Sequence, residues 1–403
     1  MNVREPSGSL RAEALGACRI AVAHDYLTQR GGAERVTLEL IRALRPDSVV
    51  TAIYSPERTF PEFSALKISA SLLSRVSLFR RDARAALPFL AAAWSARPRV
   101  AADVVVCSSS GWAHGVRVSK GARKVVYCHN PARWLYQTSD YLIGQQSYVK
   151  IALQILRPFL VWWDRIAAES AHVLIANSTS VAERIRRAYG REASVIFPPV
   201  SVDPNLPQEP IAGLKPPFFL KVGRSRGYKG ANLLVDAFRG MPDHTLVTAG
   251  GELLTDAPSN VKSLGFVSEA QLRWLYSNAR ALISVSREDF GLTPIEANAF
   301  GTPALLIRAG GFLDSTDEGV SGKFIESESI EAIQDAVHAF PQEWDRDAIL
   351  RHAAKFSPAR FHEAIREVVL QALAGREEEA PTRSARRPMR RAVGWSWARG
   401  SLT

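Results

Sequence analysis

The sequence predicts an α/β protein with two doubly wound parallel-sheet domains that face each other across a cleft. Short apolar runs alternate with helix-patterned segments, a proline-rich stretch interrupts the series near mid-chain, and the alternation then starts again. Apolar strands that alternate with helices are typical of a parallel sheet covered on both faces. The restart after the interruption therefore indicates a second domain of the same class.

The first half of the alternation begins with a β-rich run at residues 19–24, which the glycine pair Gly31-Gly32 follows. A helical pattern comes next at 33–44. Further strands are expected at 49–54, 104–108, 124–129, 173–177 and 195–197, and a helix at 180–189.

Seven prolines between residues 198 and 217 exclude regular structure there and indicate a linker. After it, strands are expected at 218–222, 245–249, 281–285 and 303–307, and helices at 232–238, within 267–276, and at 293–300, 329–340 and 358–373. We expect an extension at 1–17, an N-terminal domain at 18–200, the linker at 201–217, a C-terminal domain at 218–356, a helix at 357–374 that packs back on the N-terminal domain, and a basic tail at 375–403.

The composition is that of an ordinary globular protein, with 46% hydrophobic and 23% charged residues. Its cysteines, Cys18, Cys107 and Cys128, form no CxxC pair, which argues against a disulfide framework or a zinc site and favours a reducing cytoplasm. The first 17 residues lack the apolar core of a secretory signal, and polar residues interrupt the most apolar stretch, 151–168. We therefore expect a cytoplasmic protein without a spanning helix.

The net charge is +11, and six arginines follow Pro381 without a neighbouring acid. Such a tail is either a solubilising end or a segment attracted to anionic lipid or nucleic acid. No recognisable nucleic-acid module precedes it, so a nucleic-acid partner is not expected. Trp395 and Trp397 in the tail favour the headgroup region of a membrane.

A second membrane signal lies at residues 79–99, where Leu87, Phe89, Leu90 and Trp94 are interleaved with arginines. Apolar residues beside arginines are typical of an interfacial helix. We expect peripheral contact with an anionic membrane; the alternative is that residues 87–94 belong to the core.

The strongest signal for chemistry is EDFGLTPIE, where Glu288 and Glu296 flank the predicted start of a helix near Leu292. Free N–H groups at a helix start favour an anion such as phosphate. Glu296 could accept hydrogen bonds from a vicinal diol and Glu288 from a second polyol. The alternative is a pair of surface glutamates beside a tight turn.

The second signal is GRSRGYKG at 223–230, between a predicted strand and helix, where Arg224 and Lys229 could both reach one diphosphate. It does not match GxxxxGK followed by Ser or Thr, so it does not predict a P-loop. The alternative is a solvated basic loop.

Three further signals are Gly31-Gly32, His129 at a strand end, and Gly310-Gly311. All five fall at strand-to-helix junctions, where doubly wound sheets bind ligands.

These motifs resemble those of the retaining GT-B glycosyltransferases of family 4, also called glycosyl transferases group 1, over residues 19–373. The E-x7-E pair is the most specific, GRSRGYKG is similar to the family's donor-phosphate loop, and GGAER to its N-terminal glycine loop. YCHNPARWLY at 127–136 is similar to a stretch of a subgroup related to O-antigen mannosyltransferases. Lys221, Asn298 and Phe300 depart from the family pattern and leave the donor open.

The resemblance implies two Rossmann-like domains and transfer of a hexose, with retention, from a nucleotide-diphosphate sugar to a glycan or lipid-linked acceptor in polysaccharide or glycolipid biosynthesis. GDP-mannose is the favoured donor; a UDP-sugar such as UDP-glucose is the alternative. No DxD-type pair stands where a metal-dependent transferase needs one, so no metal or other cofactor is expected. A non-catalytic nucleotide-sugar-binding protein on the same scaffold is the second alternative.

The resemblance also assigns site residues. Catalytic roles are expected for His129, Arg224, Lys229 and Glu288. Donor contacts are expected for Gly31, Gly32, Gly223, Arg224, Lys229, Glu288, Phe290, Gly291, Leu292 and Glu296. Acceptor contacts are expected for Glu34, Arg35 and Arg133.

Overall fold

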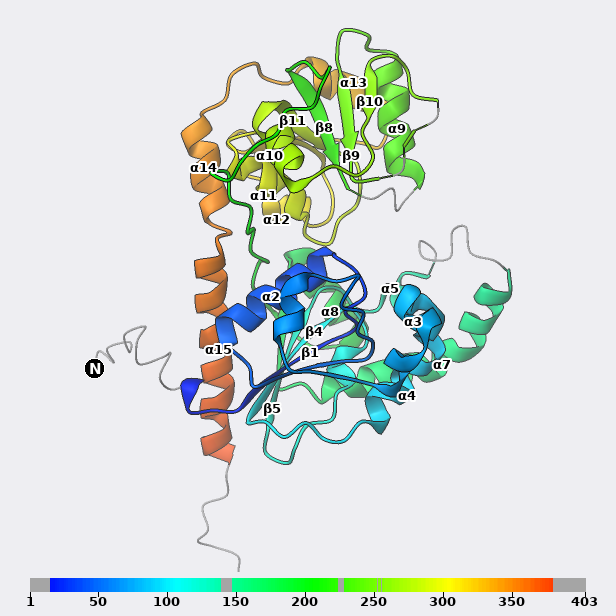
Figure 1. Cartoon of the computed structure of the whole chain (residues 1–403), viewed down its shortest axis with the longest axis vertical. Coiled ribbons are helices and arrows are strands. Elements are labelled where there is room, and N and C mark those ends of the chain that lie inside the picture. Colours follow the sequence, from blue (N-terminus) through cyan, green and yellow to red (C-terminus); the bar gives the residue numbers. More distant parts are fainter. Residues whose placement is uncertain (1–14, 139–146, 224–227, 252, 255, 380–403) are drawn as a thin grey trace, which may run out of the picture.

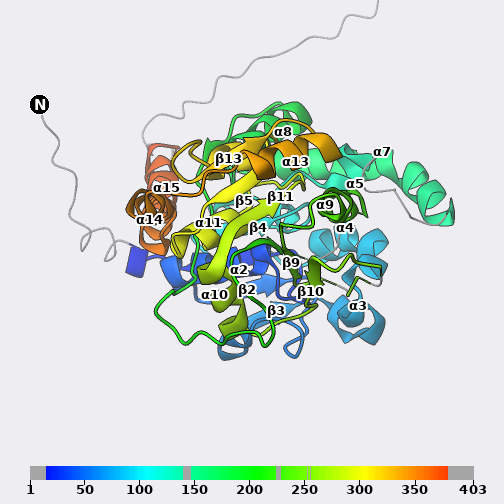
Figure 2. The ribbon, with the colours of Figure 1, turned by 90° about the horizontal axis from the view of Figure 1, so that it is seen from above.

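A computed structural model describes residues 15–138, 147–223, 228–251, 253–254 and 256–379. It contains two separate parallel sheets, one of seven strands and one of six, each flanked by helices (Figures 1 and 2). The predicted fold class is therefore confirmed. The two domains lie one above the other in Figure 1, and the long helix α15 runs down one side of the lower, N-terminal domain.

The N-terminal sheet has the strand order β3-β2-β1-β4-β5-β6-β7. Its strands are β1 (Ile20–His24), β2 (Ser48–Thr51), β3 (Ile68–Ala70), β4 (Val104–Ser109), β5 (Arg123–Cys128), β6 (Val173–Ala176) and β7 (Ser194–Val195). Its larger helices are α2 (Gly32–Leu44), α4 (Leu87–Ala96), α7 (Ser147–Glu169) and α8 (Thr179–Tyr189), with the short helices α3 (Ser77–Arg81) and α5 (Arg133–Tyr136). The strand order reverses between β1 and β4, and ligands bind at such a switch point in this architecture.

The C-terminal sheet has the order β10-β9-β8-β11-β12-β13. Its strands are β8 (Phe218–Val222), β9 (Leu246–Ala249), β10 (Val261–Ser263), β11 (Ala279–Ser284), β12 (Ala304–Ile307) and β13 (Gly322–Ile325). Its helices are α9 (Tyr228–Arg239), α10 (Glu269–Asn278), α11 (Leu292–Ala299), α12 (Phe312–Ser315), α13 (Ile330–His338) and α14 (Arg346–Ala354). The N-terminus of α10 is capped, because the Ser268 hydroxyl accepts a hydrogen bond from the Gln271 backbone N–H at 3.1 Å.

Three strands, β3, β10 and β13, were not predicted from the sequence, and all three lie at sheet edges. β3 and β10 have only three residues each, and β13 begins with a glycine. Such short strands, half open to solvent, carry no continuous apolar run, so pairing with a neighbour decides their conformation.

The chain passes between the domains twice. Residues 196–217 form no helix or strand and lead into β8. After α14 the chain returns as α15 (Pro358–Glu379), whose Phe361, Ile365 and Val369 are buried in the N-terminal core beside α2. His362 Nε2 lies 2.8 Å from Glu39 Oε2 of α2. The last helix therefore belongs to the N-terminal core although it follows the C-terminal domain.

Within the described residues, no helix is both long and apolar enough to cross a bilayer.

Candidate active site

The carboxyl ends of the two sheets meet at the boundary between the domains (Figure 1). The start of α2 lies close to the start of α11, because a side-chain carbon placed on Gly32 would lie 3.3 Å from Leu292 Cδ1. After β6, the Thr179 backbone N–H donates to Asp314 Oδ2 of α12 at 2.8 Å. These contacts bring the carboxyl ends of the two sheets together at the domain boundary, and doubly wound sheets bind ligands beyond those ends.

The start of α11 is shaped by Gly291, whose φ of +86° lies in the left-handed region. A side chain at this position would also collide with the Phe312 ring, at 2.4 Å. Glycine therefore lets the chain turn sharply before Leu292. The helix start, with the backbone N–H groups of its first turn, consequently lies opposite the Gly31-Gly32 loop.

Glu296 lies one turn into α11 and is held from both domains. The Tyr276 hydroxyl donates to Glu296 Oε2 at 2.7 Å. Arg35 Nη1, from α2 of the other domain, lies 3.7 Å from Glu296 Oε1. Arg35, expected on the acceptor side, therefore reaches the acid expected to bind the donor.

Glu288 follows β11 and is open to solvent, although much of the surrounding volume is protein. Partial desolvation by that protein, and then the nearby Asp289 carboxylate, raise the pKa of Glu288. Arg133 and Lys221 oppose this rise. The balance leaves Glu288 more easily protonated than an ordinary glutamate.

Lys221 is a site residue that the sequence analysis noted only as a departure from the family pattern. It lies in β8 and is buried, and burial lowers the pKa of its ammonium group, while Glu288 acts in the opposite direction. The sequence did contain a signal for this role, a lysine in an otherwise apolar strand. A charge buried in such a strand requires a partner, and so indicates a nearby acid.

Asp289 joins the domains through two arginines. Arg133 Nη2 donates to Asp289 Oδ2 at 2.5 Å, and Arg184 of α8 pairs with Asp289 Oδ1. Arg133, also expected at the acceptor, therefore holds the loop that carries Glu288. Charge-assisted contacts of this kind fix the position of a loop.

His129 directly follows β5 and is 8% exposed. Its Nε2 is 2.7 Å from Ser108 Oγ. The same Ser108 Oγ lies 3.1 Å from His24 Nδ1 and accepts a hydrogen bond from the Thr37 hydroxyl. Burial, and then the neighbouring His24, lower the pKa of His129 to about 3. The imidazole is therefore neutral near pH 7, and its side chain is enclosed by protein.

Glu34 is 1% exposed and does not open to the cleft in this structure, contrary to its expected acceptor contact. Its Oε1 lies 4.0 Å from His24 Nε2, and its Oε2 has no hydrogen-bond partner. A side-chain carbon at Gly31 would lie 2.5 Å from that Oε2. Gly31 therefore packs directly against the Glu34 carboxylate, where a larger residue would not fit.

The sequence matches two family models that follow one another along the chain. Residues 30–204 match Glycosyltransferase Family 4, and residues 203–356 match Glycosyl transferases group 1. The chain is a GT-B glycosyltransferase of family 4.

Individual proteins agree with this assignment. The glycosyltransferase is 24% identical to the human alpha-1,3/1,6-mannosyltransferase ALG2 over 402 residues, which cover 85% of this chain and 94% of ALG2. Anabaena Alr3699/HepE, solved in complex with UDP, aligns with a TM-score of 0.64 at 16% identity, over 88% of this chain and all of the other. Sucrose-phosphate synthase from Thermosynechococcus elongatus aligns with a TM-score of 0.62 at 17% identity, over 89% of this chain and all of the other. At these identities the two structures show the shared fold.

Some residues expected to contact the donor lie outside the described part of the glycosyltransferase, and others are buried against protein. Arg224 is outside the described residues, and Lys229 lies in α9 with its side chain outside them. Gly223 directly follows β8 and has a φ of +139°. The Phe290 side chain is buried and stacks on Phe197 at 5.5 Å, so only its backbone can face a donor.

Gly310-Gly311 approaches protein backbone instead of a ligand. A side-chain carbon on Gly310 would lie 2.5 Å from the Glu288 carbonyl oxygen, and one on Gly311 would lie 2.1 Å from Phe290 Cα. The Gly311 N–H donates to that Glu288 oxygen at 2.9 Å. These glycines therefore support the loop that carries Glu288.

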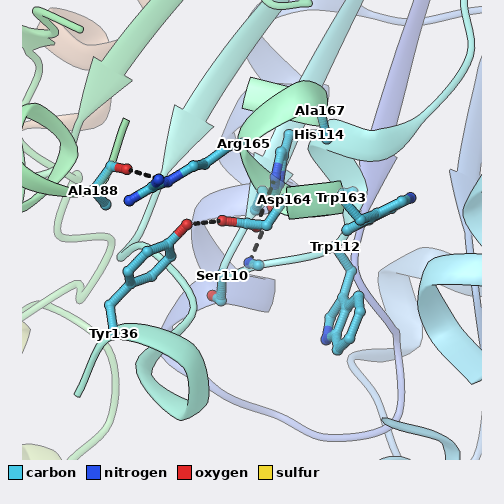
Figure 3. Close-up of polar contacts among 12 residues, drawn as sticks. Ser110, Trp112, His114, Tyr136, Trp163, Asp164, Arg165, Ala167 and Ala188 are labelled. Atoms are coloured by element: carbon cyan, nitrogen blue, oxygen red, sulfur yellow. Dashed lines mark hydrogen bonds and ion pairs between the residues drawn. The ribbon is translucent and has the colours of Figure 1, made fainter. Parts of the chain in front are cut away.

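A second buried polar cluster of the glycosyltransferase was not foreseen from the sequence (Figure 3). His114 Nε2 lies 3.0 Å from Asp164 Oδ1 of α7, and the Tyr136 hydroxyl donates to Asp164 Oδ2 at 2.8 Å. Ser109 Oγ lies 2.9 Å from His114 Nδ1. Ser109, His114 and Asp164 are almost fully buried, so this row cannot meet a substrate and instead fixes α7 on the domain.

Among the described residues, no three His, Cys, Asp or Glu side chains form a group that could hold a metal ion.

Proposed function

We propose that this glycosyltransferase transfers a hexose, mannose by preference, from a nucleotide-diphosphate sugar to a glycan or lipid-linked acceptor with retention of configuration. The product belongs to polysaccharide or glycolipid biosynthesis. The observation that carries the proposal is the position of Glu288 and Glu296. They flank the start of α11, which faces the Gly31-Gly32 loop across the cleft.

The donor is held from the C-terminal domain. The free N–H groups at the start of α11, together with Arg224 and Lys229, meet the diphosphate, whose negative charge grows as the sugar leaves. Glu296 accepts hydrogen bonds from the ribose diol, and Glu288 from hydroxyls of the transferred sugar. Lys221 supplies a cationic partner near Glu288.

The transfer takes place on one face of the sugar. The acceptor oxygen forms a bond to the anomeric carbon on the side from which the diphosphate departs, and the acceptor proton passes to a donor phosphate oxygen. The surroundings of His129 support this route, because an imidazole with a pKa of about 3 is a weak base near pH 7. Arg224, Lys229 and the N–H groups at the start of α11 stabilise the negative charge of the phosphate, so the proposed reaction needs no metal.

GDP-mannose is the proposed donor. The similarity to ALG2, a mannosyltransferase, and the stretch YCHNPARWLY support mannose. A UDP-sugar is the second candidate, because HepE, which shares the fold, was solved in complex with UDP-glucose. The proposed location is the cytoplasm, with peripheral contact to the inner face of the cytoplasmic membrane.

A thermal-shift panel followed by turnover assays tests the proposal. A ligand that binds only the folded state stabilises it by about 2.7 kcal/mol at a hundred times its Kd. We expect GDP-mannose to raise the melting temperature and to be slowly hydrolysed without an acceptor. Stabilisation and turnover with UDP-glucose alone would reassign the donor. Stabilisation without hydrolysis or transfer from any donor, with a panel of lipid-linked and free glycan acceptors, would favour the non-catalytic binding protein.

A further inference from the structure

Helix α7 exposes a row of large apolar side chains. Ile155, Phe159, Trp162 and Ile166 are 72%, 56%, 58% and 47% exposed. Their spacing of four, three and four residues places them on one face of the helix. Single exposed apolar residues are common on proteins, but a contiguous row marks an interaction site.

The opposite face of α7 fixes the outward direction of this row. Leu160, Asp164 and Ala167 are buried against the domain, and Asp164 is bound to His114 and Tyr136 (Figure 3). Rotating α7 to hide the row would bring Asp164 to the surface and leave His114 without this partner. Leaving a buried polar group without its partner is unfavourable. The apolar face therefore stays exposed.

The segment with α3 and α4 lies at the same end of the N-terminal domain as α7 (Figures 1 and 2). Trp163 Nε1 of α7 donates to Ser95 Oγ of α4 at 2.8 Å. This segment also exposes apolar side chains, namely Leu72, Val76, Leu78 and Phe89. We call the exposed residues of α7 and these four the docking face.

The docking face shares only Phe89 with the four apolar residues that were predicted for membrane contact within residues 79–99. Leu90 and Trp94 are buried in the core, so that part of the sequence prediction is wrong. Arg97 donates to the carbonyl oxygens of Thr51 and Ser69 at 2.9 and 2.8 Å and therefore has a structural role. The sequence alone did not distinguish the buried Leu90 and Trp94 from the exposed Phe89, because apolar residues occur on both faces of α4.

Positive charge surrounds the docking face. Residues 72–99 include six arginines and one aspartate. Arg75 and Arg81 of this segment are exposed. Arg157 and Arg165 of α7 are exposed as well, although the Nε group of each also donates to a backbone carbonyl, of Leu135 and Ala188 respectively. Apolar side chains beside arginines match the boundary between the acyl chains and the headgroups of an anionic leaflet. A second copy of this chain would bring the same positive charge to the contact.

We propose that the docking face binds anionic membrane, with Phe159 and Trp162 inserted between the headgroups and the arginines paired with lipid phosphates. This inference rests on the peripheral membrane contact proposed above and names the surface that makes it. Binding involves neither the cleft nor the donor, so its failure would leave the proposed transfer reaction intact. An acceptor carried by the same leaflet would then be confined to the surface on which the enzyme lies.

Co-sedimentation of the full chain with vesicles tests the proposal. We expect the protein to pellet with phosphatidylcholine vesicles that contain phosphatidylglycerol, to pellet weakly with phosphatidylcholine alone, and to release as salt rises. The Phe159→Ser/Trp162→Ser variant should bind the anionic vesicles at least about tenfold more weakly. Arg75→Gln/Arg81→Gln should weaken binding and flatten its salt dependence.

Two matched controls keep the result specific. Phe266, 82% exposed in the C-terminal domain, gives Phe266→Ser, which should bind like the wild type. Trp395→Ser/Trp397→Ser removes two aromatic residues from the tail and should retain most of the binding. Melting temperatures of all variants should match the wild type, because the substituted apolar side chains are exposed or lie in the tail.

Three outcomes would overturn the proposal. The wild type could stay in the supernatant with anionic vesicles at low salt. The α7 variant could bind as the wild type does while the tail variant does not. The wild type could be a dimer by light scattering without lipid while the α7 variant is a monomer, which would make the docking face a contact between copies.

Discussion

Arg35 of the N-terminal domain lies against Glu296 of the C-terminal domain, with 3.7 Å between Nη1 and Oε1. The Tyr276 hydroxyl holds the other oxygen of the same carboxylate. Each carboxylate oxygen therefore has a protein partner, and one of them belongs to the opposite wall of the cleft. This contact connects the acid proposed to bind the ribose to the relative position of the domains.

Replacing Glu296 should matter more for nucleotide affinity than replacing Arg35. Glu296→Gln keeps an oxygen for Tyr276 but loses the charge-assisted bonds to the ribose, so GDP or UDP affinity should fall about tenfold or more. Arg35→Ala removes a partly exposed ion pair, which is worth about 1 kcal/mol or less, or about fivefold. Calorimetric titration measures both. Equal losses in the two variants would contradict the assignment of Glu296 to the ribose.

The loop at residues 223–230 should supply the diphosphate contacts. Each charge-assisted hydrogen bond contributes roughly 1.5–3 kcal/mol, so Arg224→Ala and Lys229→Ala should each weaken nucleotide-diphosphate affinity by about one to two decades. Arg226→Ala is the matched control, since it removes a positive charge from the same loop and should cost less than about fivefold. Unchanged affinity in both of the first two variants would remove the phosphate assignment.

Turnover should survive chelation. Side chains and the start of α11 meet the phosphate charge in the proposed mechanism, so EDTA should leave the initial rate unchanged. The rate is measured with the best donor of the thermal-shift panel, before and after dialysis against EDTA. Loss of turnover that magnesium or manganese restores would refute metal independence.

The pH dependence should report on Glu288. Its pKa is raised by desolvation and by Asp289, so kcat/KM should fall on the acid side at a higher pH than an ordinary glutamate would give. Glu288→Gln should lower the rate and lose that acid limb.

The same substitution should not destabilise the protein near neutral pH. A folded-state pKa above the unfolded value favours the protonated form on folding, and that stability is lost as pH rises through the folded pKa. The ionised carboxylate is therefore unfavourable in the folded protein at pH 7. A melting temperature of Glu288→Gln clearly below the wild type at that pH would contradict this account.

His129 should not titrate in the physiological range. Its folded pKa of about 3 lies below the unfolded value, so it contributes stability at neutral pH that is lost as pH falls below the unfolded value. The melting temperature of the wild type should therefore fall more between about pH 7 and pH 5 than that of His129→Asn. A kinetic limb near the ordinary histidine pKa that this variant abolishes would show that the imidazole titrates during catalysis.

The sequence by itself determined the two-domain architecture. Alternating apolar runs identified ten of the thirteen strands in the described residues, each within three positions of its bounds. Proline density located the crossing at 198–217, and the turn before α11 was visible in Gly291 and Pro294. These features are local, because strand period, helix starts and turns depend on residues that are neighbours in the chain.

Tertiary structure decided which polar groups meet and which surfaces stay open. Arg133 and Asp289 are separated by 156 residues, and Arg35 finds Glu296 only because the domains face each other. The apolar residues of α7 and α4 look alike in sequence, yet Trp94 is buried and Trp162 is exposed. No local period encodes these outcomes, because they depend on packing between elements that are distant in the chain. The buried Asp164–His114 contact settles the orientation of α7, and with it the face that the helix presents to its surroundings.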